Sequence, residues 1–288
     1  MSIDLHTHST ASDGTDTPAQ LMAKASAQGL SVIALTDHDT TAGWEPAEQA
    51  LPAGLTLIRG TEFSCVHQGA DGERISLHLL GYLFDPDHIA LKAERARLRE
   101  SRLGRGEQIV RNLIADGYPV TWERVQQVAN GASVGRPHIA QVLVENHVVA
   151  SVDEAFAELL ASNGKYYAAK ADTDVMDAIA MVKAAGGVTV FAHPFARRRG
   201  RVVDDDTIKA MAAAGLHGLE VDHLDHTEQD RAALRSLATE LGLLQTGSSD
   251  YHGTNKTTPL GACTTAPEQL EALLAIPTAL RPVTNAAR

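Results

Sequence analysis

The fold is decided by two short stretches, SIDLHTH at residues 2–8 and LSVIALT at residues 30–36. In the first, apolar and polar residues alternate, and this period of two predicts a β-strand. The second is an apolar run rich in β-branched residues, which is typical of a strand buried in a parallel sheet. Between them, Thr17 and Pro18 predict a helix start and Gly29 a helix end. Together they predict a βα unit.

The same alternation continues in the rest of the chain. Further strands are expected at 56–64, 75–82, 187–193, 218–221 and 243–248, with helices near 174–185, 204–214, 227–241 and 266–275. Strands that alternate with helices indicate an α/β fold built on a parallel sheet or barrel.

The stretch from residue 86 to 169 breaks this alternation. It has no strong strand pattern, and it predicts helices at 88–116, 121–129, 136–147 and 151–162. We therefore expect three parts: residues 1–85 as the first part of a barrel, 86–169 as a helical insertion that caps the substrate, and 170–288 as the second part.

Composition narrows the class of protein. The chain has 288 residues, of which 44% are hydrophobic, and its formal net charge is −11. That apolar fraction excludes a disordered chain, and the negative charge argues against a broad nucleic-acid surface. Two cysteines and the absence of a signal or membrane-spanning pattern lead us to expect a cytoplasmic protein. We expect no membrane partner, and no obligate protein partner is evident.

Metal-ligating side chains recur at the ends of the predicted strands. They are His6, His8, Asp13, His38, Glu62, His78, His193, Asp250 and His252. The carboxyl ends of barrel strands form one face, so these side chains are expected to meet there. Nitrogen and oxygen donors without a thiolate suit two or three divalent ions, most naturally Mn²⁺, with Fe²⁺ or Zn²⁺ as alternatives.

Single residues at these strand ends also fit simpler roles. Asp37 and Asp39 could cap a helix that begins near Thr40, and a lone His78 could be an ordinary strand histidine. A carboxylate such as Glu62 in an apolar strand is costly to bury unless it is paired or bound to metal. Ser248 and Ser249 lack the sequence context of a serine nucleophile, so we expect them to shape a strand end.

The motifs at these strand ends resemble those of the PHP (polymerase and histidinol phosphatase) family of metallophosphoesterases. The matching segments are DLHTHS (4–9), DG (13–14), LTDHD (35–39), GTE (60–62), His78, AHP (192–194) and SDYH (249–252). The resemblance implies a distorted (β/α)7 TIM-like barrel with up to three metals. The GRPHIA and GKYY segments of the insertion resemble one branch, which includes 3',5'-nucleotide bisphosphate phosphatases and 5'-to-3' exoribonucleases.

The resemblance also implies how the ligands are shared. His6, His8, Glu62 and Asp250 would hold a first ion, and Glu62 would bridge to a second ion held by His78 and His193. Asp13, His38 and His252 would hold the third. Glu62, His193 and Asp250 are then the expected catalytic residues, with a water shared by two ions as the nucleophile.

A substrate with a second phosphate needs positive groups near the metals. We expect Arg102, Arg105, Gly135, Arg136, Lys170 and Arg197 to contact the substrate. Arg198, Arg199 and Arg201 are instead expected to be surface charges paired with Asp204–Asp206. Asp39 and His223 are candidates to protonate the leaving group.

We therefore expect a phosphatase that removes the 3'-phosphate of a nucleoside 3',5'-bisphosphate of the phosphoadenosine phosphate type. Short RNA is the alternative substrate, cleaved by the same site acting as a 5'-to-3' exoribonuclease. A histidinol-phosphatase-like enzyme, an amidohydrolase-type hydrolase and a non-enzymatic binding protein are further alternatives that activity assays would separate.

Overall fold

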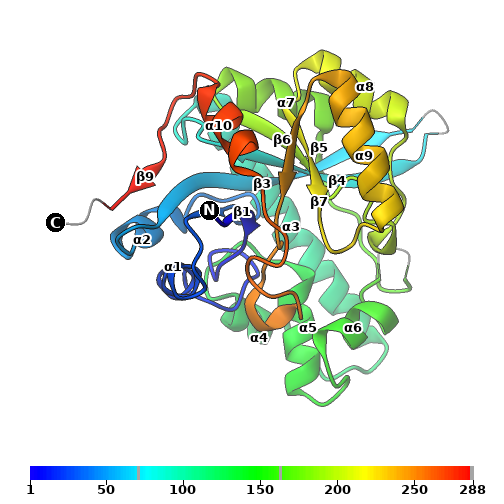
Figure 1. Cartoon of the computed structure of the whole chain (residues 1–288). Helices are drawn as coiled ribbons and strands as arrows, with labels where there is room; N and C mark the ends of the chain where they lie inside the picture. Colours follow the sequence, from blue (N-terminus) through cyan, green and yellow to red (C-terminus); the bar gives the residue numbers. More distant parts are fainter. Residues whose placement is uncertain (70–71, 162–163, 286–288) are drawn as a thin grey trace.

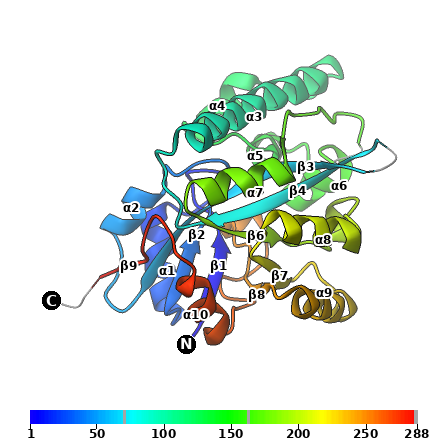
Figure 2. The same ribbon diagram turned by 90° about the horizontal axis from the view of Figure 1, so that it is seen from above.

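A nine-stranded sheet lies at the centre of the computed structural model, which describes residues 1–69, 72–161 and 164–285, and helices surround it (Figures 1 and 2). The strands are β1 (Ile3–Thr7), β2 (Val32–Leu35), β3 (Thr56–Gln68), β4 (Arg74–Tyr82), β5 (Thr173–Asp174), β6 (Val188–Ala192), β7 (Gly218–Asp222), β8 (Leu244–Gly247) and β9 (Val283–Thr284). The helices around the sheet are α1 (Pro18–Ala27), α2 (Trp44–Gln49), α7 (Val175–Ala184), α8 (Asp205–Ala214), α9 (Glu228–Leu241) and α10 (Pro267–Ala275).

The sheet is nearly closed into a barrel. Seven strands follow one another in the order β1-β2-β3-β4-β6-β7-β8, while β5 and β9 pair with β3 outside this path. The segment after β8 returns to β1, where the His8 amide donates a hydrogen bond to the Tyr251 carbonyl at 2.9 Å. The expectation of an α/β barrel is confirmed, and the strand ends meet at one face.

The barrel is distorted at β4, where the expectation of parallel strands is wrong. β3 and β4 form an antiparallel hairpin, and β4 is antiparallel to β6 as well. A hairpin needs only a short turn, so no helix separates these two strands. The reversal places His78 opposite Ser64, two residues after Glu62 on β3, and opposite Ala192, the last residue of β6.

Four helices fill the stretch between β4 and β5. They are α3 (Ile89–Ala115), α4 (Trp122–Ala129), α5 (Arg136–Glu145) and α6 (Val152–Glu158), and they gather at one side of the barrel in Figure 1. Buried Val110, Val125, Ile139 and Leu143 belong to an apolar cluster separate from the barrel core. The helix expected over 151–162 ends earlier, and its residue 162 lies outside the described residues.

None of the helices in the described ranges combines the length and apolar composition needed to cross a bilayer.

Candidate active site

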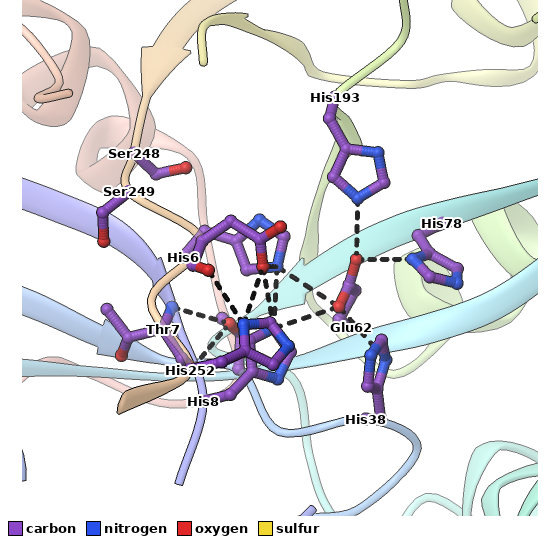
Figure 3. Close-up of polar contacts among 12 residues, drawn as sticks. His6, Thr7, His8, His38, Glu62, His78, His193, Ser248, Ser249 and His252 are labelled. Carbon is purple, nitrogen blue, oxygen red and sulfur yellow. Dashed lines mark hydrogen bonds and ion pairs between the residues drawn. The ribbon is translucent and has the colours of Figure 1, made fainter. Parts of the chain in front are cut away.

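The nine strand-end residues lie together at the carboxyl face of the barrel. Figure 3 shows His38, His78 and His193 around the carboxylate of Glu62, with His6, His8 and His252 beside it. Eight of the nine are buried, and His78 is partly buried. Three groups have donor atoms mutually within 4.8 Å: His6-His8-Glu62-Asp250, His8-Asp13-His38-His252 and His38-Glu62-His78.

The first group has the spacing of ligands around one ion. His6 Nε2 lies 3.1 Å from His8 Nε2 and 3.2 Å from Glu62 Oε2. Asp250 Oδ1 lies 3.5 Å from His6 Nε2 and 3.4 Å from His8 Nε2. Ligands bound at about 2.1 Å lie roughly 3.0–3.4 Å from one another. The four atoms therefore fit a divalent transition-metal ion.

The carboxylate of Glu62 also faces a second set of donors. Its Oε1 lies 2.7 Å from His78 Nδ1 and 3.1 Å from His193 Nε2. Its Oε2 lies 3.1 Å from His38 Nδ1, and neither of these two buried atoms makes a hydrogen bond to the described residues. A carboxylate whose two oxygens face different donor sets can bridge two ions.

Asp13, His38 and His252 form the outer part of the site. Asp13 Oδ1 lies 3.4 Å from His252 Nε2, and Asp13 Oδ2 lies 3.7 Å from His38 Nε2. Asp13 and His252 come from the loops after β1 and β8, and His38 follows β2. These three donors fit a further ion.

Several imidazoles of the site are held neutral, as metal ligation requires. Burial, reinforced by the nearby Arg199, lowers the pKa of His193 to about 3. Burial and the ammonium of Lys256 lower the pKa of His252 to about 4.

The centre of the site, in contrast, favours positive charge. Burial disfavours an ionised Glu62, but the imidazoles of His78 and His38 outweigh it and hold its pKa well below the ordinary value. Burial likewise opposes protonation of His8, yet the nearby carboxylates of Asp250 and Glu62, 3.4 and 3.1 Å from its Nε2, raise its pKa to about 9. The carboxylates of Glu62 and Asp250 therefore stabilise positive charge between them, and a divalent metal ion would supply that charge.

Glu220 on β7 is a site residue that the sequence reasoning missed. It is fully buried, its Oε1 lies 3.1 Å from His6 Nδ1, and its Oε2 accepts the His193 amide at 2.7 Å. Ser248 also donates its hydroxyl to Glu220. A carboxylate on Nδ1 directs Nε2 of the same ring toward the other ligands. An acid between the apolar residues of the strand GLEVD was the available signal, by the same argument that pointed to Glu62.

Asp250 is oriented by two cations. Its Oδ2 accepts from Arg199 Nη2 at 2.7 Å and from Lys256 Nζ at 2.6 Å, which leaves Oδ1 facing the histidines. The expectation that Arg199 is a surface charge paired with Asp204–Asp206 is therefore wrong. The short 3-10 turn at Arg197–Arg199 brings it onto the loop after β8.

Asp204 and Asp206 have other partners. Asp204 caps α8 by accepting from the Thr207 amide, and Asp206 pairs with Lys209. Arg201 pairs with Glu73 of the β3–β4 hairpin.

Asp37 and Asp39 fix loops instead of capping a helix. Asp37 accepts from the amide and hydroxyl of Ser9, at 2.8 and 2.7 Å. Asp39 accepts from the amide and hydroxyl of Ser64, both at 2.8 Å. The helix-cap interpretation fails because α2 begins only at Trp44. Both carboxylates flank His38, and so hold it between β1 and β3.

Asp4 makes the third contact of this kind. It accepts from the Ser249 amide at 3.1 Å and from its hydroxyl at 2.5 Å. Ser249 precedes Asp250, so this contact fixes the last ligand segment to β1. Ser248 and Ser249 both act in this supporting way, as the sequence predicts.

Four of the expected substrate contacts gather beside the metal ligands as a cationic cluster, which consists of Arg102, Arg105, Arg136 and Lys170. Arg102 Nε donates to Asp39 at 2.5 Å, and Lys170 pairs with Asp172. Burial lowers the pKa of Arg105 to about 9, with Arg136 and Arg102 adding to it. Because these neighbouring positive charges repel one another away from water, binding an anion between them is favourable.

The two remaining expected contacts differ from each other. Gly135 lies against the site, because a Cβ there would come 3.3 Å from Asp13 Oδ2. Arg197 is directed elsewhere: its side chain is 60% exposed, and it pairs with Asp230 of α9 at 3.3 Å.

His223 faces the metal ligands with one ring nitrogen. Its Nδ1 accepts from the Asp225 amide at 3.0 Å, so in the neutral ring the proton sits on Nε2. That Nε2 lies 3.5 Å from Asp250 Oδ2 and makes no hydrogen bond to the described residues.

Imidazoles and carboxylates that are spaced as metal ligands at the carboxyl face of a barrel are typical of a metal-dependent hydrolase. The PHP domain model matches residues 4–168. The chain is 35% identical over 251 residues to a 5'-3' exoribonuclease of Haemophilus influenzae, covering 86% of this chain and 89% of that protein. It is 33% identical to a 3',5'-nucleoside bisphosphate phosphatase of Chromobacterium violaceum, with 87% of each chain covered.

A solved structure from Bifidobacterium adolescentis, described as a metal-dependent phosphoesterase, is also similar. It shares 35% identity and a TM-score of 0.90 with this chain, over 96% of both. The chain belongs to the PHP family and is a metal-dependent phosphoesterase.

Replacing Glu220 with Gln tests its orienting role. The amide removes the charge that fixes the His6 tautomer, so we expect the affinity for Mn²⁺ to fall by about 10–100-fold. Metal titration followed by activity measures this, and saturating Mn²⁺ should restore kcat. Glu240→Gln, on the exposed face of α9, is the control. Unchanged metal affinity in Glu220→Gln would show that Glu220 does not orient His6.

Replacing Glu62 with Gln tests the bridge. The amide keeps the size of the side chain but offers only one ligand oxygen, so we expect at least one ion per chain to be lost and phosphate release to fall on the order of 100-fold or more. Elemental analysis and a phosphate assay measure the two effects. Glu48→Gln on α2, which removes the charge paired with Arg59 of β3, is the control. Full metal content in Glu62→Gln would contradict the bridging geometry.

Proposed function

We propose that this chain hydrolyses the 3'-phosphate of nucleoside 3',5'-bisphosphates, of the phosphoadenosine phosphate type, to give a 5'-nucleotide and phosphate. The observation that carries the proposal is the cationic cluster beside the metal ligands. Metals alone suffice for one phosphate, whereas arginines next to the metals suit a substrate with a second phosphate. The similar phosphatase of Chromobacterium violaceum supports this substrate class.

In this proposal the site binds two or three divalent ions, with Mn²⁺ the best match to mixed imidazole and carboxylate ligands. Fe²⁺ and Zn²⁺ are the alternatives. His6, His8, Glu62 and Asp250 would hold one ion. Glu62, His78 and His193 would hold the second, and Asp13, His38 and His252 the third.

Bound ions would supply an activated water and neutralise the phosphoryl oxygens. The chain's own residues position these partners: Glu62 fixes the separation of the two inner donor sets, and Asp250 is held by Arg199 and Lys256. His223 is proposed to stabilise the leaving oxygen by donating a hydrogen bond to it, because its Nε2 proton faces the site. Asp39 is less suitable, since Arg102 overcomes the effect of burial and lowers its pKa.

The segment 86–169 is proposed as the substrate cap. Arg102, Arg105, Gly135 and Arg136 come from it, and Lys170 follows it directly. The Arg136 guanidinium donates to the Leu160 carbonyl at 2.7 Å and lies over the Phe156 ring. These contacts preorganise Arg136 within the helical segment, which reduces the entropy lost when it binds a phosphate. Arg197 would contact only a substrate that extends toward α9.

A 5'-to-3' exoribonuclease acting on short RNA is the second candidate. It is favoured by the similarity to the Haemophilus influenzae exoribonuclease. The same metal ligands and cationic cluster would suit an exoribonuclease, because each step of RNA degradation also breaks a phosphoester bond next to a second phosphate.

A substrate comparison tests the proposed function. We expect the Mn²⁺-loaded protein to release phosphate from adenosine 3',5'-bisphosphate at least about 10-fold faster, in kcat/KM, than from adenosine 3'-phosphate or histidinol phosphate. A chelator should abolish the reaction. Faster cleavage of a tetranucleotide than of the bisphosphate would favour the second candidate, and equal rates on all monoesters would contradict both.

The titration of Lys170 provides a test of the cationic cluster. Burial, then the nearby Arg102, lowers its pKa to about 8, so the ammonium loses its charge above that pH. We expect kcat/KM for the bisphosphate to fall as pH rises through 8. Lys170→Arg keeps the charge and should move this fall upward by a pH unit or more. The same alkaline fall in both proteins would exclude Lys170 from substrate binding.

A further inference from the structure

A groove lies next to the metal site, beside the first turns of α3. It has a volume of about 500 Å³, within the usual range of ligand sites. Its other walls are the loops after β1 and β2 and the loop between α4 and α5. We call it the Arg95 groove, and its polar lining includes Thr10, Thr40, Lys92, Arg95, Arg99 and Ser133.

Two buried polar groups in this lining make no hydrogen bond to the described residues. Arg95 is 4% exposed, and its Nη1 has no such partner, although Nη2 donates to the Pro86 carbonyl at 2.6 Å. Ser133 is also 4% exposed, and its hydroxyl is likewise without one. A buried guanidinium nitrogen and a buried hydroxyl beside one groove need a partner, and an anionic ligand or an ordered water in the groove would supply it.

The lining of the groove is cationic in an acidic chain. Lys92, Arg95 and Arg99 line it, and within the described part of the chain no Asp or Glu does. Lys92 pairs with Asp87 at 2.7 Å, but both side chains are more than 60% exposed, so this pair is weak. Burial, and after it the neighbouring Arg99, lowers the pKa of Arg95 to about 10, and a bound anion would offset this by stabilising the charged guanidinium.

The groove is joined to the metal site by the backbone. Thr10 and Thr40 each lie two residues after an expected metal ligand. Arg99 Nη1 donates to the Asp39 carbonyl at 2.9 Å, and the Ser133 amide donates to the Ala11 carbonyl at 3.2 Å. A ligand in the groove therefore lies next to the loops that carry His8 and His38.

The Arg95 groove and the cationic cluster form one stripe along α3, from Lys92 to Arg105. At about 1.5 Å per residue this stripe is about 20 Å long. Successive phosphates of a stacked strand rise about 3.4 Å each, so the stripe spans several nucleotides. A single nucleoside bisphosphate would leave one end of it unoccupied.

We propose that the Arg95 groove binds an internucleotide phosphate of a short oligonucleotide whose terminal phosphoester lies at the metals. The inference rests on the proposed function, since it assumes phosphoester cleavage at that site. Arg95 and Lys92 supply the charge, and Ser133 supplies a hydroxyl donor. The groove thereby adds a contact for an oligonucleotide that a mononucleotide at the metals does not reach.

Substitutions on α3 test the proposal. In Lys92→Ala and Arg95→Gln we expect KM for a 5'-phosphorylated tetranucleotide to rise about 5–10-fold, with kcat/KM for adenosine 3',5'-bisphosphate unchanged. Each lost contact should also make the salt dependence of tetranucleotide binding shallower, by about 0.7 in the log–log slope. Arg111→Gln, an exposed cation farther along α3, is the matched control and should change neither.

Either of two kinetic outcomes would overturn the proposal. Equal losses on the bisphosphate and the tetranucleotide would mean that the groove acts on the mononucleotide itself or on the fold. Unchanged kinetic constants on both substrates would show that the Arg95 groove is a solvated surface without a binding role. If the wild-type protein cleaves neither substrate, the proposed function fails. Calorimetry with a phosphorothioate tetranucleotide then still tests the groove, and equal affinity in wild type and Lys92→Ala would overturn it.

Discussion

The ionised carboxylate of Glu62, buried among imidazoles, is the interaction on which the rest of the site depends. Without a positive partner, a buried carboxylate costs several kcal/mol. Here its two oxygens face two donor sets, with His6 and His8 on one side and His78 and His193 on the other. The barrel makes this possible because these residues come from different strands that end at one face.

The supporting shell follows a repeated pattern around the barrel. A buried aspartate accepts both the amide and the hydroxyl of a serine on a neighbouring strand or loop: Asp4 with Ser249, Asp37 with Ser9, and Asp39 with Ser64. Each contact lies within two residues of an expected metal ligand. Ligand atoms held in this way lose little entropy when an ion binds. The left-handed backbone at Asp39, His193 and Asp250 indicates the same strict positioning.

Much of this could be predicted from the sequence, because strand ends combine two strong local signals. Apolar runs located most of the strands, and histidines and acids placed just after them located the donors. The antiparallel β4 could not be predicted, since a hairpin between two apolar strands resembles a short βα connection in sequence. Arg199 was missed because its role depends on contacts with residues far away in the chain, whereas Glu220 carried the same signal as Glu62, an acid in an apolar strand, and was overlooked. The substrate-binding residues of the helical segment are harder still to predict. Helix periodicity shows which residues share one face of α3, but not which part of the protein packs against that face.

The central claim is that Glu62 separates two divalent ions. Anomalous X-ray diffraction at the manganese edge, on crystals grown with Mn²⁺, tests it most directly. The account predicts one anomalous peak among His6, His8, Glu62 and Asp250, and a second among Glu62, His78 and His193. Full-occupancy Mn²⁺ elsewhere, with no peak on either side of Glu62, would contradict it.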